Sequence, residues 1–383
     1  MLKIVNKSYC CGCTACESIC GVGALSMVPD KLGFVYPTID VDKCIDCGLC
    51  QRVCSFKSLI PSLDKRFPLF YAARHRNVNE VERSRSGAVF VALSDWILNN
   101  GGSVYGAALT DTFEVFHKRV TTFAERDSLR GSKYVQSDIS GIYKQVKYDL
   151  INGMKVLFSG TPCQVSGLKS YLSILKVDLS NLLLVDVVCH GVPSPFYWRD
   201  YISYIERKEG TRITSVNFRD KERFGWSSHK ESFRFANGES KSFRHSFYHD
   251  IMLRRSCGVC PYSSTQRVSD ITIGDFWGWE RLGCPINDDN KGVNLLMVNT
   301  EQGEYIFDEI KGRLIYYQTE ESKCLQPNLL HPTSPHPLQQ SFEEDYIYRG
   351  FEYVGKRYTD LGWRREWNNV KSIVKGMFQK VIK

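Results

Sequence analysis

Two runs of cysteines with the same spacing constrain this chain more than any other feature. Each run reads C-x2-C-x2-C-x3-C. Three thiolates at this spacing can hold three irons of one 4Fe–4S cubane, while the fourth cysteine of the run reaches the other cubane. The predicted ligands of the first cluster are therefore Cys10, Cys13, Cys16 and Cys54, and those of the second are Cys44, Cys47, Cys50 and Cys20.

Zinc is the alternative metal for these cysteine runs. Structural zinc sites use paired cysteines separated by a long gap, without a third cysteine three residues on, so the spacing favours clusters. The proline that usually follows the fourth cysteine is replaced by Gly21 and Ser55. That change weakens a helix-start pattern but alters no ligand. Cys11 is spare, and we interpret it as a buried or incidental thiol.

The cysteine content and the charge of the chain bear on its cellular compartment and on the classes of function it can have. The 383 residues include fifteen cysteines. The N-terminal segment lacks the apolar stretch of a secretory signal, and no aliphatic run could span a bilayer. We therefore expect a cytoplasmic protein whose cysteines bind metal. The formal charge of +8 does not include the clusters, each of which carries a charge of about −2. The chain has no Lys/Arg-rich block of the kind that binds nucleic acid. A zinc-dependent nucleic-acid binder, which would be colourless, is the alternative.

The expected fold class is an α/β multidomain protein. A small α+β ferredoxin-like domain with two 4Fe–4S clusters covers residues 1–58, including a hairpin or loop at 24–42, and a linker follows at 60–68. A mixed α/β flavin-binding domain covers 69–211. A mixed α/β C-terminal domain at 212–362 completes a third cluster and the flavin site, and a basic amphipathic helix covers 363–383.

Strands and helices alternate in the middle of the chain. Helices are expected at 88–99, 139–152 and 164–172, and strands at 103–109, 155–159 and 182–188. Further strand-like segments lie at 215–218, 231–235 and 270–274. This alternation predicts a largely parallel sheet whose strand ends carry the site loops.

Four further cysteines lie in polar loops rich in glycine and proline. Cys163 and Cys189 each follow a predicted buried strand, and Cys257 and Cys260 form a C-x-x-C loop. Four thiols from three such loops could hold a third 4Fe–4S cluster. A thioredoxin-like redox pair at the C-x-x-C loop, a zinc site and purely structural cysteines are the alternatives. Cys284 and Cys324 are isolated and expected to be inert.

Several motifs together resemble a known family. They are the twin cluster motif, Ser86-Gly87, Gly131-Ser132-Lys133-Tyr134, the segment from Phe158 to Gln164, Cys189-His190-Gly191, the Cys257/Cys260 pair and the segment from Asp270 to Asp275. In this combination the chain resembles the coenzyme F-420 (deazaflavin) hydrogenase/dehydrogenase beta-subunit family over nearly its whole length. The resemblance implies a third cluster, a bound FAD and electron transfer to a second redox partner.

The resemblance also directs attention to hydroxyl, glycine and lysine residues. Ser86, Gly87, Ser132, Lys133, Ser159, Gly160 and Thr161 supply the amides, hydroxyls and cation that a flavin diphosphate requires. For Lys133 the alternative is a solvated lysine. Ala88 stands where the family has a second glycine. No G-x-G-x-x-G pattern indicates a Rossmann NAD site.

We therefore expect a cytoplasmic iron–sulfur flavoprotein oxidoreductase. Electrons would pass from a ferredoxin-like carrier or partner redox subunit through the clusters to FAD and on to a small-molecule or lipid-linked substrate, or in reverse. The alternative is an electron-wiring subunit of a larger complex, without a substrate site of its own. No catalytic residue is assigned, and FMN and deazaflavin remain open.

The last segment, 363–383, carries an apolar stripe at helical spacing and a strongly basic opposite face. Such a helix is typical of peripheral contact with an anionic membrane, here the inner face. The alternative is that its apolar stripe packs on the protein's own core.

Overall fold

The computed structural model describes residues 6–57, 66, 68–244, 246–359 and 361. The predicted helix at 363–383 and most of the predicted linker lie outside these residues. The N-terminal module contains α1 (Ala15–Ser18), a hairpin of β1 (Leu25–Pro29) and β2 (Val35–Ile39), and α2 (Leu49–Arg52). β1 and β2 pair antiparallel, so of the two alternatives predicted between the cysteine runs, a hairpin or a loop, the hairpin is confirmed.

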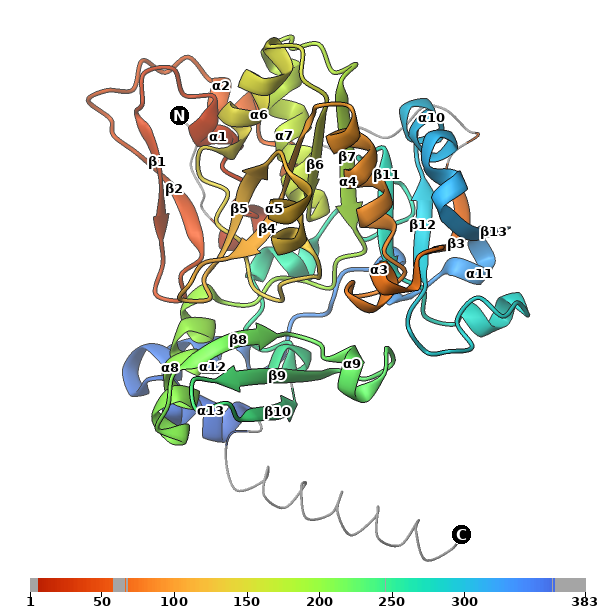
Figure 1. The fold of residues 1–383 in the computed structure, drawn as a ribbon. Coiled ribbons are helices and arrows are strands. Elements are labelled where there is room, and N and C mark those ends of the chain that lie inside the picture. The colour runs from red at the N-terminus through yellow and green to blue at the C-terminus, as the bar shows by residue number, and fades with distance from the viewer. Residues whose placement is uncertain (1–5, 58–65, 67, 245, 360, 362–383) are drawn as a thin grey trace, which may run out of the picture.

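An eight-stranded sheet forms the centre of the molecule, in the order β13-β3-β12-β11-β7-β6-β4-β5 (Figure 1). Its strands are β3 (Leu69–His75), β4 (Ser103–Leu109), β5 (Val115–Val120), β6 (Val156–Gly160), β7 (Leu182–Val187), β11 (Ile271–Asp275), β12 (Asn294–Val298) and β13 (Leu314–Thr319). Only β11, β7, β6 and β4 are mutually parallel. The expectation of a largely parallel sheet thus holds for these four strands alone. β12 returns from β11 without an intervening α-helix, so it pairs antiparallel, as do the flanking strands.

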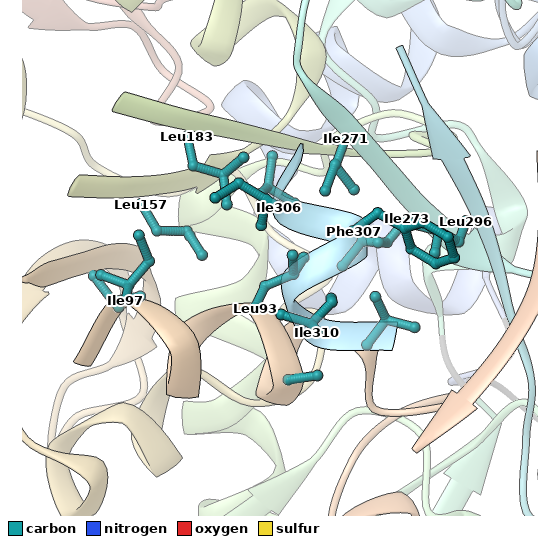
Figure 2. Packing of buried hydrophobic residues seen from close by; sticks show 14 of the residues in the cluster. Leu93, Ile97, Leu157, Leu183, Ile271, Ile273, Leu296, Ile306, Phe307 and Ile310 are labelled. Carbon is teal, nitrogen blue, oxygen red and sulfur yellow. The ribbon is translucent and has the colours of Figure 1, made fainter. Parts of the chain in front are cut away.

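Helices cover both faces of this sheet. α4 (Val89–Asn99) and α10 (Glu301–Ile310) pack on one face, where Leu93 and Phe307 join a cluster of aliphatic strand residues (Figure 2). α6 (Ile142–Ile151) and α7 (Pro162–Ile174) pack on the other. Successive strand residues alternate between the two cores: Leu157 belongs to the first and Phe158 to the second.

A second, three-stranded antiparallel sheet is formed by β8 (Ile213–Asn217), β9 (Lys230–Phe235) and β10 (Ser240–Arg244). It lies with α8 (Pro195–Glu209), α12 (Gln339–Arg349) and α13 (Phe351–Tyr358) below the main sheet in Figure 1. The remaining short helices are α3 (Val78–Glu82), α5 (Phe123–Arg126), α9 (Lys221–Phe224) and α11 (Glu321–Cys324), and 3-10 turns complete the chain.

The predicted helices and strands from residue 88 to residue 188 are confirmed as α4, β4, α6, β6, α7 and β7, with ends shifted by a few residues. The three later strand-like segments correspond to β8, β9 and β11. Within the described residues, no helix combines the length and the apolar character needed to cross a bilayer.

The loop before α4 has an unusual backbone. Ala88 precedes the helix with φ +64°, in the left-handed region that glycine adopts most easily. The alanine therefore takes the conformation for which the resembling family uses glycine.

Candidate metal centres and cofactor site

The first predicted cysteine group converges in space. Burial raises the pKa of the Cys16 thiol, and the neighbouring Cys13, Cys10 and Cys54 raise it further. Cys54 belongs to the second run, so the module wraps in the cross-linked manner that the spacing predicts.

The second predicted group lies nearer to the solvent. Cys20 follows α1, Cys50 lies within α2, and the two short helices pack together. Gly48, with φ +71°, turns the chain into α2. Cys47 is exposed, whereas Cys20, Cys44 and Cys50 are half-buried. This group therefore forms the outer end of the module.

A single zinc ion and a 4Fe–4S cubane require different separations between their thiolates. Among the described residues, no three histidine, cysteine, aspartate or glutamate side chains are placed to share one metal ion. A zinc ion draws its thiolates to about 2.3 Å from one centre. A cubane presents four separate irons, so its four thiolates stand further apart.

A third group of cysteines gathers where two parallel strands end. Cys163 opens α7 directly after β6, and Cys189 follows β7. Burial raises the pKa of Cys189, and Cys257, Cys163 and Cys260 raise it further, so the four thiols face one another. The four cysteines that the sequence placed in three separate loops are thus brought together.

Small side chains and a histidine network hold the loops of the third group. A Cβ on Gly191 would lie 3.0 Å from Leu253 Cδ1 and 3.4 Å from Cys257 Cβ. His190 Nε2 lies 2.6 Å from Asp250 Oδ1. Burial opposes protonation, but the hydrogen bond to Asp250 raises the pKa of His190 above its usual value. The loop after β7 is therefore held rigidly against the C-x-x-C loop.

Cys11 connects the first group to the third. It is buried in a core against which Cys13 and Cys163 pack, and both of them raise the pKa of its thiol. Cys11 is in turn the largest influence on Cys163, whose pKa falls to about 7. A Cβ on Gly167 of α7 would lie 2.8 Å from Cys13 Sγ, so the module sits directly on this helix. The interpretation of Cys11 as incidental missed this bridging position, because spacing alone carries no information about it.

The Ser86-Gly87 segment follows β3 at the same edge of the sheet. The Ser86 hydroxyl donates to Val293 O at 2.7 Å, and a Cβ on Gly87 would lie 2.4 Å from Ala73 O. Glycine is required here because the loop lies flat on the strands. The Ser86 side chain therefore holds the loop in place, and the backbone of the loop lies along this edge of the main sheet.

Lys133 lies half-buried in the same region. Its ammonium donates to Ser128 O at 2.9 Å and to Arg130 O at 3.0 Å, which leaves one of its three N–H donors without a partner in the described structure. Burial, with help from Arg85 and Lys118, lowers the pKa of Lys133 to about 7. The neighbouring Ser132 is exposed. The ammonium group of Lys133 is therefore not fully solvated, in contrast to that of a typical surface lysine.

Four basic residues form what we call the cationic cluster: Arg85, Lys133, Arg219 and Lys221. Arg219 pairs with Asp275 of β11. Lys221 donates to Val81 O and Lys291 O, both at 2.5 Å, and burial with Arg85 lowers its pKa to about 7. The Nε atoms of Arg85 and Arg219 are buried without a partner among the described residues. The cluster is therefore short of acceptors, and an anion would supply them.

Aromatic side chains lie beside the cationic cluster. Trp226 stacks on Trp277 at 4.7 Å between ring centroids, and its Nε1 donates to Asp275 Oδ1 at 3.0 Å. The Arg219 guanidinium lies 5.2 Å from the centre of the Trp277 ring. Arg219 and Trp226 lie in the connection between β8 and β9 of the small sheet, whereas Trp277 follows β11 of the main sheet.

Ser159, Gly160 and Thr161 connect the third cysteine group to Lys133. Thr161 Oγ1 lies 3.2 Å from Cys163 Sγ, and Gln164 Oε1 accepts from the Thr161 amide. Ser159 O accepts from His117 Nε2 at 3.0 Å, and burial lowers the pKa of His117 to about 4. The positive charge of Lys133 also lowers the pKa of His117.

Two family models match this chain. Residues 153–323 match the model for the C terminus of the coenzyme F420 hydrogenase/dehydrogenase beta subunit, and residues 9–58 match "4Fe-4S dicluster domain". Residues 153–323 thus form a domain of the type found at the C terminus of the coenzyme F420 hydrogenase/dehydrogenase beta subunit, the family that the sequence motifs resemble. The N-terminal module is a 4Fe–4S dicluster domain.

Two relatives of this family are similar over most of the chain. The F subunit of the F(420)H(2) dehydrogenase of Methanosarcina mazei is 22% identical over 82% of this chain and 85% of its own length. "Coenzyme F420-dependent sulfite reductase" of Methanocaldococcus jannaschii is 24% identical over 81% of this chain, which spans 47% of that longer protein. A chain in the F420-reducing [NiFe] hydrogenase complex from Methanosarcina barkeri aligns over 75% of this chain and 90% of its own, with 15% identity and a TM-score of 0.47.

Several residues of this candidate site escaped sequence reasoning. Arg85 adjoins the Ser86-Gly87 motif, and Arg219 and Lys221 lie together after β8. Asp275 ends a quoted motif but had no assigned role. A basic residue next to a glycine loop is a usable pattern, whereas the contact between Arg85 and Asn217 at the end of β8 depends on tertiary structure.

Cross-ligation in the dicluster domain gives a direct prediction. Cys54→Ala should remove the cluster whose other thiols are Cys10, Cys13 and Cys16, because Cys54 approaches that group. Cys20→Ala should instead remove the cluster of the second run. Electron paramagnetic resonance of the reduced protein distinguishes the two signals. Loss of the same signal in both variants would contradict the wrapping.

Proposed function

We propose that this protein is an iron–sulfur flavoprotein oxidoreductase. It would pass electrons between a ferredoxin-like carrier and FAD through three 4Fe–4S clusters, and between FAD and a substrate. The proposal depends most on the position of Cys11, which lies between the first cysteine group and the third. When bound, the clusters transfer single electrons and the flavin exchanges them for pairs.

The proposed order of the redox centres follows the positions of the cysteine groups and the cationic cluster. The group containing exposed Cys47 lies at the outer end, and α1 and α2 connect it to the first group. Cys11 lies between the first group and Cys163, which is at the start of α7. The segment from Thr161 back to Ser159 then reaches His117, next to Lys133. The series thus runs from the surface to the cationic cluster.

The cationic cluster is the proposed site for the flavin diphosphate. Its unpartnered Nε donors and the third N–H of Lys133 are suited to phosphate oxygens, since charge-assisted hydrogen bonds to phosphate are strong. Trp226 and Trp277 offer aromatic surface beside it. Both relatives are named for coenzyme F420, so that coenzyme is the first substrate to test.

Rapid mixing tests the proposed route. With a reduced ferredoxin as donor, bleaching of the clusters should precede bleaching of the flavin. Cys163→Ala should leave the dicluster domain reducible but slow flavin reduction by at least about a hundredfold, as it removes a thiol of the third group. The buried Cys324, which lies in a separate apolar core, provides the matched control variant Cys324→Ala. Flavin reduction at the parent rate in Cys163→Ala would contradict the route.

The pH dependence of flavin binding gives a further prediction. Lys133 and Lys221 have pKa values of about 7 in the free protein. A bound anion favours their charged forms and raises both values. Affinity for FAD should therefore be constant well below pH 7 and fall above it, by up to about tenfold per pH unit for each lysine.

Equilibrium dialysis of FAD at pH 6, 7.5 and 9 measures this dependence. Lys133→Met should weaken binding at pH 6 and reduce the slope above pH 7. Lys144→Met, on the exposed side of α6, is the control and should change neither. Affinity that stays constant from pH 6 to pH 9 in the parent protein would remove both lysines from the site.

A second candidate function is an electron-wiring subunit of a larger complex. Val41 and Ile45 are 65% and 68% exposed in the loop that carries Cys44 and Cys47, as at a surface that docks a partner. One relative is named as a subunit of a dehydrogenase. Gentle purification from cells would distinguish the two: a stable stoichiometric complex favours the subunit, and an isolated active chain favours the enzyme.

A further inference from the structure

Arg254 is buried at the junction of the first and third cysteine groups. Its side chain is 1% exposed. Nε donates to Cys10 O at 2.8 Å, Nη1 to Gln136 Oε1 at 2.9 Å and Nη2 to Val35 O at 2.8 Å. Its own carbonyl accepts from the Cys257 amide at 2.9 Å. One residue thus contacts the cysteine loops of both groups.

The acceptors of Arg254 are neutral, which distinguishes it from the other buried arginines. Arg74, Arg126, Arg219 and Arg267 each pair with an aspartate. Arg254 has no carboxylate within ion-pair distance among the described residues. A buried cation without a counter-charge is costly, so an anion absent from the protein's own side chains is expected beside it.

The sulfur atoms show where that anion belongs. Nη2 of Arg254 lies 3.8 Å from Cys10 Sγ. Burial raises the pKa of Cys10 and of Cys257, and the Arg254 charge opposes the rise at both. The same charge also acts on Cys13 and Cys163. The guanidinium therefore lies within electrostatic reach of two cysteine groups.

Aromatic rings keep water from this position. The guanidinium lies 4.4 Å from the centre of the Tyr36 ring and 5.4 Å from that of Phe34. Both rings come from the β1–β2 hairpin and its turn. In such a low-dielectric environment a fixed charge acts more strongly on its neighbours than it would in water.

We propose that Arg254 is a shared counter-charge that raises the reduction potentials of the first and third clusters. The part concerning the third cluster rests on the proposed function. Reduction adds one electron to a cluster that is already anionic, and the adjacent cation stabilises the more negative product. Arginine stays protonated throughout, so the electron arrives without proton uptake at Arg254 and the effect is independent of pH.

Potentiometric titration of the holoprotein, followed by electron paramagnetic resonance, tests the proposal. In Arg254→Met the ratio of reduced to oxidised cluster at a fixed potential should fall at least about tenfold for the first and third clusters, or 59 mV for a one-electron couple. The second cluster should not change. Arg254→Lys keeps the charge and should stay within about twofold of the parent, and the shift in Arg254→Met should be equal at pH 6 and pH 9.

A matched control removes a buried arginine elsewhere. Arg126 of α5 pairs with Asp95 at 2.6 Å and contacts no cysteine. Arg126→Gln should leave every potential unchanged. Unchanged potentials in an iron-replete Arg254→Met would overturn the proposal, as would equal shifts in all three clusters.

The lysine variant decides the question if Arg254→Met fails to assemble. A tenfold or larger fall in Arg254→Lys would show that bonding geometry matters rather than charge, which overturns the proposal. Near-parent potentials in Arg254→Lys would support it. Iron content separates this outcome from failure of the proposed function: about eight irons per chain would remove the third cluster but leave the prediction for the first.

Discussion

Cys189→Ala should lower the iron content from about twelve to about eight per chain while both clusters of the N-terminal module remain. Cys189 faces Cys257, Cys163 and Cys260, and it follows a central strand of the sheet. An alanine there supplies no ligand, so only three thiols are left for a site that uses four. Colorimetric iron analysis of anaerobically purified protein gives the number directly.

Cys284→Ala is the matched control for this prediction. Cys284 is also half-buried, but it packs against an apolar core that includes Phe276 and Leu295, and this core contains none of the predicted ligand cysteines. Its replacement should leave the iron content unchanged. An unchanged count in Cys189→Ala would assign the third group to structural cysteines.

Asp275→Asn should destabilise the protein by about 3–5 kcal/mol, the second large effect. The substitution leaves the fully buried Arg219 guanidinium without its acid, and breaking a buried ion pair from one side costs about this much. It also weakens the bond from Trp226. Anaerobic urea unfolding followed by circular dichroism measures the change, and flavin retention should fall with it.

A surface ion pair provides the comparison. Asp308 and Lys311 lie 2.7 Å apart with side chains 57% and 47% exposed. Asp308→Asn should change the unfolding free energy by less than about 0.5 kcal/mol, because exposed pairs contribute little. Equal losses in the two variants would show that Arg219 and Asp275 are not a buried structural pair.

The dicluster domain was predictable because its information is local. A spacing of two or three residues between cysteines predicts which thiols share a cubane and which cross over, and the structure brings Cys54 near Cys16 of the first run. The hairpin was predictable for the same reason, from its proline and glycine breakers. The central strands were predictable from short apolar runs followed by glycine or cysteine.

The antiparallel part of the sheet and the cationic cluster were not predictable in this way. β3 pairs with β12 and β13, more than two hundred residues later in the chain. No local pattern encodes that pairing. Arg85 lies between α3 and α4, whereas Arg219 and Lys221 lie just before and at the start of α9. These segments come together only in the folded structure, so each residue appears in the sequence as an ordinary basic residue.

The most direct measurement is the cofactor content of the intact chain purified without oxygen. Three cysteine groups and one cationic cluster predict about twelve irons, about twelve acid-labile sulfides and one flavin per chain, with the flavin released on denaturation. About eight irons and no flavin, in protein with full secondary structure, would contradict the series of redox centres and leave only a dicluster domain on an α/β scaffold.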